Sequence, residues 1–211
     1  SYGWRHQIDD LVSAGYRVWV PDQRGYNLSD KPNGIKSYRI DALAADVVGL
    51  IDAAGREKAF LVGHDWGAAV AWWVAEHYPD RIAKMVVMNV PNGRVMADHL
   101  RNSRAQRRKS WYMFFFQIPW LPEILIRRNN WAFGEKMLFS PGHEDSFTED
   151  DLMQYKKAWS QPRAFHSMLN WYRAFLQKSL PASENRRITV PTLLIWGKLD
   201  TALGWEMAQP S

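Results

Sequence analysis

Residues 60–73 read FLVGHDWGAAVAWW, and they decide the fold that we expect for this chain. An apolar segment typical of a buried strand runs into the turn GHDWG at residues 63–67, and small and apolar residues typical of a helix follow. Glycines on both sides of Asp65 let the backbone pass through a tight connection. This pattern is typical of a nucleophile elbow, the strained turn that presents a catalytic side chain.

Asp65 occupies the nucleophile's place in this turn, where a serine would suit attack on an acyl carbon. The N-terminus of the following helix offers free N–H groups and a positive dipole end, so the sequence predicts an ionised, exposed carboxylate. A carboxylate can displace a leaving group from a saturated carbon and form an ester, which water then hydrolyses at its carbonyl. We therefore expect electrophiles such as epoxides or alkyl halides as substrates. The structural alternative is an aspartate that only caps the helix.

Strand and helix signals alternate around the elbow, which predicts an α/β fold with a mostly parallel sheet flanked by helices. The expected strands are 16–20, 59–62, 84–90 and 189–196, and the expected helices are 38–54 and 68–78. Between residues 94 and 187 the pattern is helical without a convincing strand, which predicts an inserted helical cap. We therefore expect an α/β core at 1–93, a cap at 94–187 and the second part of the core at 188–211.

Composition excludes several other classes of protein. The net charge is +5, but the basic run at residues 94–109 carries apolar residues at helical spacing, which favours a solvated helix face over nucleic-acid binding. The apolar run at 111–126 is shorter than the roughly 20 residues that span a bilayer, so no membrane span is expected. The absence of Cys excludes disulfides and thiol catalysis and fits a cytoplasmic location. Without metal-ligand spacing, no metal or cofactor is expected.

The sequence resembles the α/β-hydrolase superfamily and, within it, the epoxide hydrolases. The GHDWG turn matches the elbow of that group, and residues 1–30 are similar to the segment after its His-Gly-x-Pro loop. SWYMFFFQIPWLPE at 110–123 and SMLNWYRA at 167–174 are similar to its helical cap. LLIWGKLD at 193–200 looks like the strand and turn that carry its acidic residue. The resemblance covers essentially the whole chain and implies an α/β-hydrolase fold with an inserted cap.

This resemblance implies roles for four residues, and the elbow geometry implies one for a fifth, Trp66. Asp65 matches the nucleophile, and Asp200 matches the acid that orients the catalytic His. Tyr112 and Tyr172 match the paired cap tyrosines that bind the epoxide oxygen, and two phenols can stabilise or protonate the alkoxide left by ring opening. Trp66 would contribute its backbone N–H to the oxyanion hole and its side chain to substrate binding. The alternatives are aromatic packing for both tyrosines and a plain turn residue for Asp200.

Two parts of the family pattern fall outside these residues. The His-Gly-x-Pro loop would precede Ser1, and none of the six histidines follows Asp200, where the pattern places the catalytic His. We therefore expect this chain to be a piece of a longer protein whose substrate is a small apolar epoxide. Two other classes stay open. A haloalkane dehalogenase would use the same nucleophile, with the Trp66 indole donating to halide, and a non-catalytic binding protein could share the scaffold.

Overall fold

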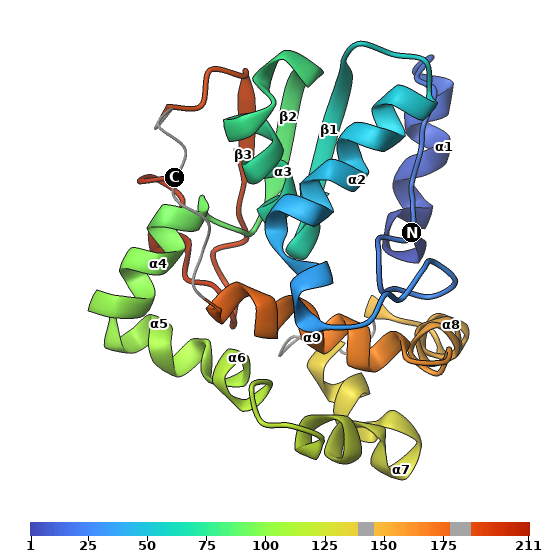
Figure 1. The fold of residues 1–211 in the computed structure, drawn as a ribbon, viewed down its shortest axis with the longest axis vertical. Helices are drawn as coiled ribbons and strands as arrows, with labels where there is room; N and C mark the ends of the chain where they lie inside the picture. The colour runs from blue at the N-terminus through green and yellow to red at the C-terminus, as the bar shows by residue number, and fades with distance from the viewer. Residues whose placement is uncertain (139–145, 178–186) are drawn as a thin grey trace. The chain divides into compact units, whose positions relative to one another are not determined.

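The computed structural model describes residues 1–138, 146–177 and 187–211 (Figure 1). The α-helices are α1 (Arg5–Ser13), α2 (Ile40–Ala53), α3 (Trp66–His77), α4 (Gly93–Asn102), α5 (Arg104–Lys109), α6 (Trp111–Phe115), α7 (Leu121–Leu138), α8 (Glu149–Trp159) and α9 (Ala164–Leu176). The strands are β1 (Ala59–His64), β2 (Ile82–Met88) and β3 (Thr192–Ile195). Short 3-10 helices are η1 (Tyr2–Trp4), η2 (Ile35–Tyr38), η3 (Pro79–Arg81) and η5 (Trp205–Met207).

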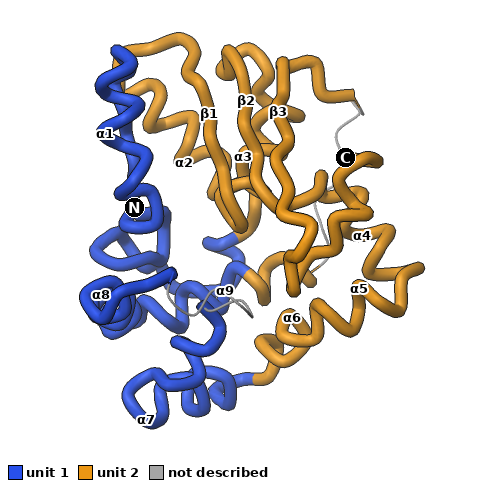
Figure 2. Tube along the Cα trace, turned by 180° about the vertical axis from the view of Figure 1, so that it is seen from behind, with its two compact units in different colours: residues 1–38, 119–171 blue, residues 39–118, 172–211 orange. Residues whose placement is uncertain are grey.

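The chain divides into two compact units, drawn in different colours in Figure 2. Unit 1 comprises Ser1–Tyr38 and Pro119–Trp171, and unit 2 comprises Arg39–Ile118 and Tyr172–Ser211. Helix α9 begins in unit 1 and ends in unit 2. The expected division into a core and a cap, with boundaries at residues 93 and 187, stays a prediction.

Unit 2 is built on a parallel sheet, as the alternation of strands and helices predicts. Among the described residues, three strands pair in the order β1, β2, β3, and both pairings are parallel. The register pairs His64 with Met88 and Met88 with Ile195. Because these three residues close their strands, the carboxyl ends of all three strands lie at one edge of the sheet.

Helices α2 and α3 cover one face of this sheet, as the two opposite views in Figures 1 and 2 show. Helix α3 packs directly on β1 and β2 and also contacts α2. Its buried residues Val70 and Val74, like Met85 and Val87 of β2, belong to the apolar core of unit 2. The burial of α3 holds the residue just before it, Asp65, at the edge of the sheet.

The strand expected at residues 16–20 is absent, so that prediction is wrong. The segment is irregular, and the N–H of Tyr16 donates to the carbonyl of Leu11 (3.1 Å), which closes the end of α1. A strand depends on hydrogen bonds to a neighbouring strand, and the described part of the chain pairs none with this segment. The side chains of Tyr16 and Trp19 are exposed, so β-propensity alone does not produce a strand here.

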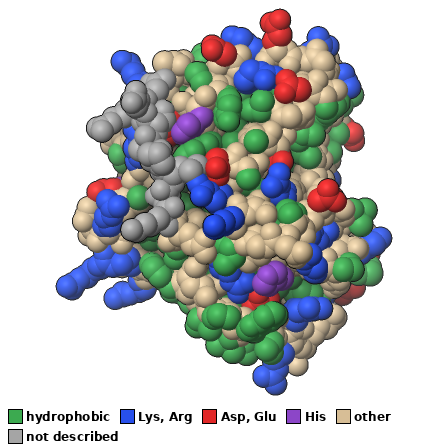
Figure 3. All heavy atoms as spheres, in the orientation of Figure 1, with side chains coloured by type: hydrophobic (Ala, Val, Ile, Leu, Met, Phe, Trp, Pro, Cys, Tyr) green, Lys and Arg blue, Asp and Glu red, His purple; other side chains and the backbone are tan. Residues whose placement is uncertain are grey.

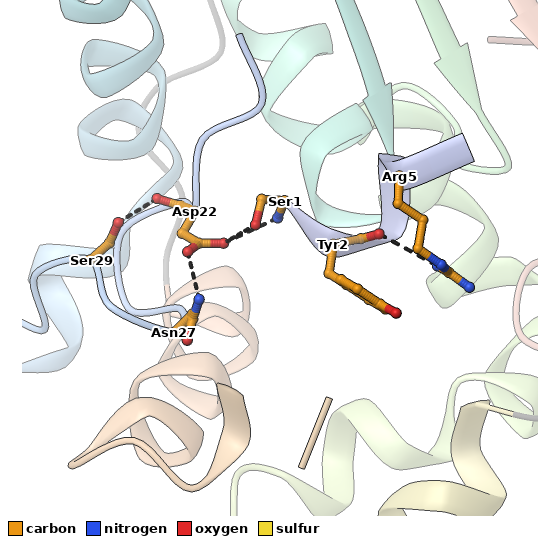
Figure 4. Close-up of polar contacts among 6 residues, drawn as sticks. All are labelled: Ser1, Tyr2, Arg5, Asp22, Asn27 and Ser29. Atoms are coloured by element: carbon orange, nitrogen blue, oxygen red, sulfur yellow. Dashed lines mark hydrogen bonds and ion pairs between the residues drawn. The ribbon is translucent and has the colours of Figure 1, made fainter. Parts of the chain in front are cut away.

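In unit 1, the turn that follows this segment is held by Asp22 (Figure 4). Its carboxylate accepts hydrogen bonds from Ser1 Oγ (2.6 Å) and Asn27 Nδ2 (2.7 Å), and its carbonyl accepts one from Ser29 Oγ (2.5 Å). Asn27 has a φ of 42°, a left-handed conformation that asparagine tolerates better than most residues. The turn-forming composition of this stretch therefore produces a loop that is held by hydrogen bonds, in line with a structural role.

Helix α7 is interrupted by a left-handed segment. Asn129, Asn130 and Trp131 have φ values of 50°, 53° and 67°, which breaks the helix in its middle. Four hydrophobic residues at its start are exposed: Trp120, Leu121, Ile124 and Leu125. Figure 3 shows a group of hydrophobic side chains in the lower part of the view. None of the described helices combines the length and the hydropathy that crossing a bilayer requires.

Asp151 joins α8 to the start of the chain within unit 1. Its Oδ1 accepts a hydrogen bond from the Tyr2 hydroxyl (2.6 Å) and pairs with the Arg5 guanidinium (2.9 Å). Its Oδ2 accepts from the N–H of Thr148, while Thr148 Oγ1 accepts from the N–H of Asp151, which completes a capping box. The hydrogen bonds from Tyr2 and then from the Thr148 backbone hold the pKa of Asp151 well below its ordinary value.

We expect Thr148→Ala to lower the free energy of unfolding by about 1 kcal/mol, because the N-cap hydroxyl of α8 is lost. Thr148→Ser keeps the hydroxyl and serves as the matched control, with a stability close to that of the wild type. Urea denaturation of both variants measures the difference. Equal losses for Ala and Ser would show that the cap hydroxyl is not what stabilises α8.

Candidate active site

Asp65 is the single residue between β1 and α3. Its φ of 51° and ψ of −128° lie outside the regions that ordinary residues occupy, and such strain is concentrated at functional sites. The Asp65 carbonyl accepts hydrogen bonds from the N–H groups of Ala68 (2.9 Å) and Ala69 (3.1 Å), which start the helix. The sequence-predicted elbow is therefore present as a strained strand-to-helix turn.

Gly63 makes this turn sterically possible. A Cβ added at Gly63 would lie 2.5 Å from the carbonyl oxygen of Gly67 and 2.7 Å from the backbone nitrogen of Ala68. Both atoms belong to the first turn of α3 and cannot rotate away, so only glycine lets β1 and α3 approach this closely.

The pKa of the Asp65 carboxyl lies above its ordinary value. Removal of water by surrounding protein atoms is the largest cause, and the negative charge of Asp200 adds to it, whereas His64 and the N–H of Trp66 act in the opposite direction. The helix N-terminus was expected to favour the ionised form, but desolvation outweighs it. Asp65 still keeps accessible surface, in agreement with the expected exposure.

The aromatic residues predicted for the site come together in unit 2. The rings of Trp66 and Tyr172 meet edge to face with centroids 4.9 Å apart, and those of Tyr112 and Tyr172 do so at 5.8 Å. Phe116 and Phe175 extend the cluster through contacts with Tyr172 and Trp66. Edge-to-face packing of this kind holds large rings in fixed positions. The two tyrosines and the elbow tryptophan therefore form one aromatic cluster.

Tyr112 lies within electrostatic reach of both predicted carboxylates. Burial raises its pKa above the ordinary value, and the negative charges of Asp65 and Asp200 raise it further. The Tyr112 hydroxyl therefore stays protonated at neutral pH and can act as a hydrogen-bond donor.

A buried arginine that the sequence analysis did not single out holds α6 against α9. Arg173 donates from Nε to the carbonyl of Phe116 (3.0 Å) and from Nη2 to that of Ile118 (3.2 Å). Gln117 Nε2 adds a hydrogen bond to the carbonyl of Tyr172 (3.1 Å). These contacts bind the end of α6 to the part of α9 that carries Tyr172. Their signal in the sequence is the charged residue directly after that tyrosine, in a helix that carries many apolar residues.

Asp200 lies in the turn that follows β3 and is bound on both carboxylate oxygens. Oδ1 accepts from the N–H groups of Ala202 and Leu203 (2.8 Å each), and Oδ2 accepts from Asn89 Nδ2 (2.6 Å). Lys109 Nζ donates to the Asp200 carbonyl (3.0 Å). Asn89 was missed by the sequence analysis, although a turn-forming residue directly after a strand is a signal that could have marked it.

Asp65, Asn89 and Asp200 follow the carboxyl ends of β1, β2 and β3, respectively. In α/β proteins, ligands bind in the crevice outside the carboxyl ends of parallel strands. The predicted nucleophile, the predicted acid and the residue that holds this acid are therefore arranged along the edge of the sheet where a catalytic site is expected.

Unit 1 contains a hollow with a volume of about 220 Å³. His166 and Glu123 line it, and Nδ1 of His166 lies 2.9 Å from Oε1 of Glu123. A second hollow of about 530 Å³ shares both residues. Neither lining includes any of the sequence-predicted site residues, so these hollows give no support to the chemistry expected at Asp65.

Comparison with known proteins places the chain in a family. The family model described as alpha/beta hydrolase fold matches residues 1–211. The chain is 46% identical to the AB hydrolase superfamily protein YfhM of Bacillus subtilis (strain 168), over 99% of this chain and 72% of that protein. It is 36% identical to Epoxide hydrolase 4 of Homo sapiens, over 99% of this chain and 58% of that protein.

Solved structures agree with these relatives. An epoxide hydrolase from Bacillus megaterium, in complex with an inhibitor, superposes with a TM-score of 0.87 at 34% identity, over 97% of this chain and 74% of that chain. The chain therefore belongs to the α/β-hydrolase fold family, and it groups with the epoxide hydrolases of that family. It spans less than two thirds of the human relative's length.

Proposed function

We propose that the protein containing this chain opens epoxides to vicinal diols through an ester on Asp65. In the first step, a carboxylate oxygen of Asp65 attacks an epoxide carbon, and the bond from that carbon to the ring oxygen breaks. The oxygen keeps the electron pair and takes a proton from the Tyr112 or Tyr172 hydroxyl. The products of this step are a hydroxyalkyl ester on Asp65 and a tyrosinate.

In the second step, water attacks the carbonyl carbon of the ester. A histidine, which the family pattern places after Asp200, takes a proton from that water, and Asp200 orients the imidazole and stabilises its positive charge. The acyl C–O bond of the tetrahedral intermediate breaks, and the leaving oxygen takes the proton from the imidazolium to become the second hydroxyl of the diol. The released Asp65 carboxyl holds the other proton of the water, and this proton returns to the tyrosinate. The net reaction adds one water to one epoxide, and both acid and base groups return to their starting protonation.

The observation that carries this proposal is a carboxylate on the strained elbow, in the same unit as an aromatic cluster containing both predicted tyrosines. A carboxylate nucleophile suits a saturated carbon, and phenol donors suit the oxygen that ring opening releases. The epoxide hydrolase names of the relatives point to the same substrate class. That both hydroxyls face Asp65 is part of the proposal.

The direct test is to incubate the full-length protein with an aryl epoxide and a bromoalkane in parallel, and to measure diol and bromide. We expect diol from the epoxide and no bromide above the uncatalysed rate. Bromide release without diol would instead establish the haloalkane dehalogenase alternative. If neither diol nor bromide forms, a non-catalytic binding protein is favoured.

We expect Tyr112→Phe and Tyr172→Phe each to slow epoxide opening, and the double variant to lose about 10²- to 10⁴-fold, which is typical of general acid catalysis. Each phenylalanine keeps the ring contacts and removes only the donor. Tyr78→Phe, which changes an exposed tyrosine at the end of α3, is the matched control. Rapid-quench measurement of ester formation checks the result. A double variant as fast as the control would remove both hydroxyls from the mechanism.

A further inference from the structure

Asn89 ties the ends of β2 and β3 together. It follows β2 with a φ of 56°, a left-handed conformation that asparagine adopts more readily than most residues. Its N–H donates to the carbonyl of Ile195 (3.0 Å), and its Oδ1 accepts from the N–H of Gly197 (3.3 Å). Its Nδ2 donates to Asp200 Oδ2 (2.6 Å). One amide side chain thus uses its donor and its acceptor to fix the segment that carries Asp200.

Among the described residues, the hydrogen bonds of the Asp200 carboxylate leave one acceptor site without a partner. Each carboxylate oxygen has about two acceptor sites. Oδ1 uses both for the N–H groups of Ala202 and Leu203, whereas Oδ2 uses one for Asn89. The bond from Asn89 therefore fixes the rotation of the carboxyl group, and the remaining acceptor site of Oδ2 points in a set direction.

We propose that Asn89 is a positioning residue that aims this remaining site of Asp200 Oδ2 at the N–H of the catalytic histidine. The inference rests on the proposed function, because only hydrolysis of the ester requires a histidine held by Asp200. Asn89 acts through Asp200, so its loss slows ester hydrolysis and leaves the attack by Asp65 unchanged. A purely structural residue would affect both steps together.

The test is Asn89→Asp in the full-length protein, followed through a single turnover with enzyme in excess. Aspartate keeps the shape, the acceptor and the tolerance of left-handed φ, but it removes the donor and places a negative charge against Asp200. Intact-mass spectrometry of quenched samples gives the ester on Asp65, and chromatography gives the diol. We expect ester formation at the wild-type rate and ester hydrolysis slower by about ten- to a hundredfold, as for loss of a hydrogen bond to a charged group.

Asn92→Asp is the matched control. Asn92 caps α4 by accepting from the N–H of Arg94 (3.0 Å), and aspartate caps a helix equally well. The control adds the same charge three residues along the chain, and we expect both steps to keep their wild-type rates. Asn89→Gly is the second variant, since glycine adopts the left-handed conformation without strain and removes the whole side chain.

The outcomes separate the inference from the function on which it rests. Slow hydrolysis with normal ester formation in both Asn89 variants supports the positioning role. Two normal steps, or two steps slowed to the same extent, overturn it. A wild-type protein that makes diol without any ester on Asp65 overturns the proposed function itself, and the role of Asn89 fails with it.

Discussion

Asp65→Ala is expected to abolish epoxide turnover by the full-length protein while leaving it folded. The carboxylate supplies the nucleophile for the first step, and alanine offers no group to replace it, so a loss of about 10⁴-fold or more is expected. The strained elbow becomes no more crowded, because the change only removes atoms. Circular dichroism and thermal unfolding should match those of the wild type, and diol formation measures the loss.

Asp80→Ala is the matched control for this experiment. Asp80 is an exposed aspartate of η3 in the same unit, so its removal changes the net charge by the same amount without touching the elbow. Its activity should equal that of the wild type. Diol formation retained in Asp65→Ala would contradict the assignment of the nucleophile.

The second large effect is expected for Gly63→Ala. The new Cβ would lie 2.5 Å from the Gly67 carbonyl oxygen and 2.7 Å from the backbone of Ala68, so β1 or the start of α3 must shift. Overpacking costs typically about 1–3 kcal/mol and occasionally more, and contact with backbone on a buried helix places this change at or above the upper end. Activity should fall as well, because the shift displaces Asp65.

Gly49→Ala is a control for which the expected change in stability has the opposite sign. Gly49 lies within α2, and a Cβ there would have no neighbour within 4 Å. Alanine in a helix interior is more favourable than glycine by about 0.5–1 kcal/mol, so this variant should be slightly more stable than the wild type. Urea denaturation compares the two. A Gly63→Ala protein as stable and active as Gly49→Ala would show that the elbow does not need glycine.

Local sequence patterns predict helices and turns, whose hydrogen bonds join neighbouring residues, and strands whose partner strands are close in the sequence. The strand β1, the helix α3 and the glycine turn between them are found where the sequence places them, and β2 and β3 differ from their predictions by a few residues at the ends. The segment 16–20 has the same β-rich composition but no partner strand among the described residues. Its failure shows that a strand requires a neighbour as well as propensity.

The residues of the candidate site also differ in whether a local sequence pattern predicts them. Asp65 could be predicted as the nucleophile from its motif, because the turn chemistry is contained in five successive residues. Tyr112, Tyr172 and Asp200 needed the family resemblance, since their significance depends on residues far away in the chain. Asn89 was not found, because the turn signal at this position does not reveal its partner Asp200, which lies 111 residues later.

The central claim is that a bond forms between Asp65 and the substrate before water enters the reaction. A single turnover of an epoxide in H₂¹⁸O, with the full-length protein in excess, tests it most directly. If water attacks the carbonyl of the Asp65 ester, the first diol carries unlabelled oxygen from Asp65, and the peptide containing Asp65 gains ¹⁸O. If the diol instead carries ¹⁸O while that peptide stays unlabelled, water attacks the epoxide itself and the covalent account is wrong.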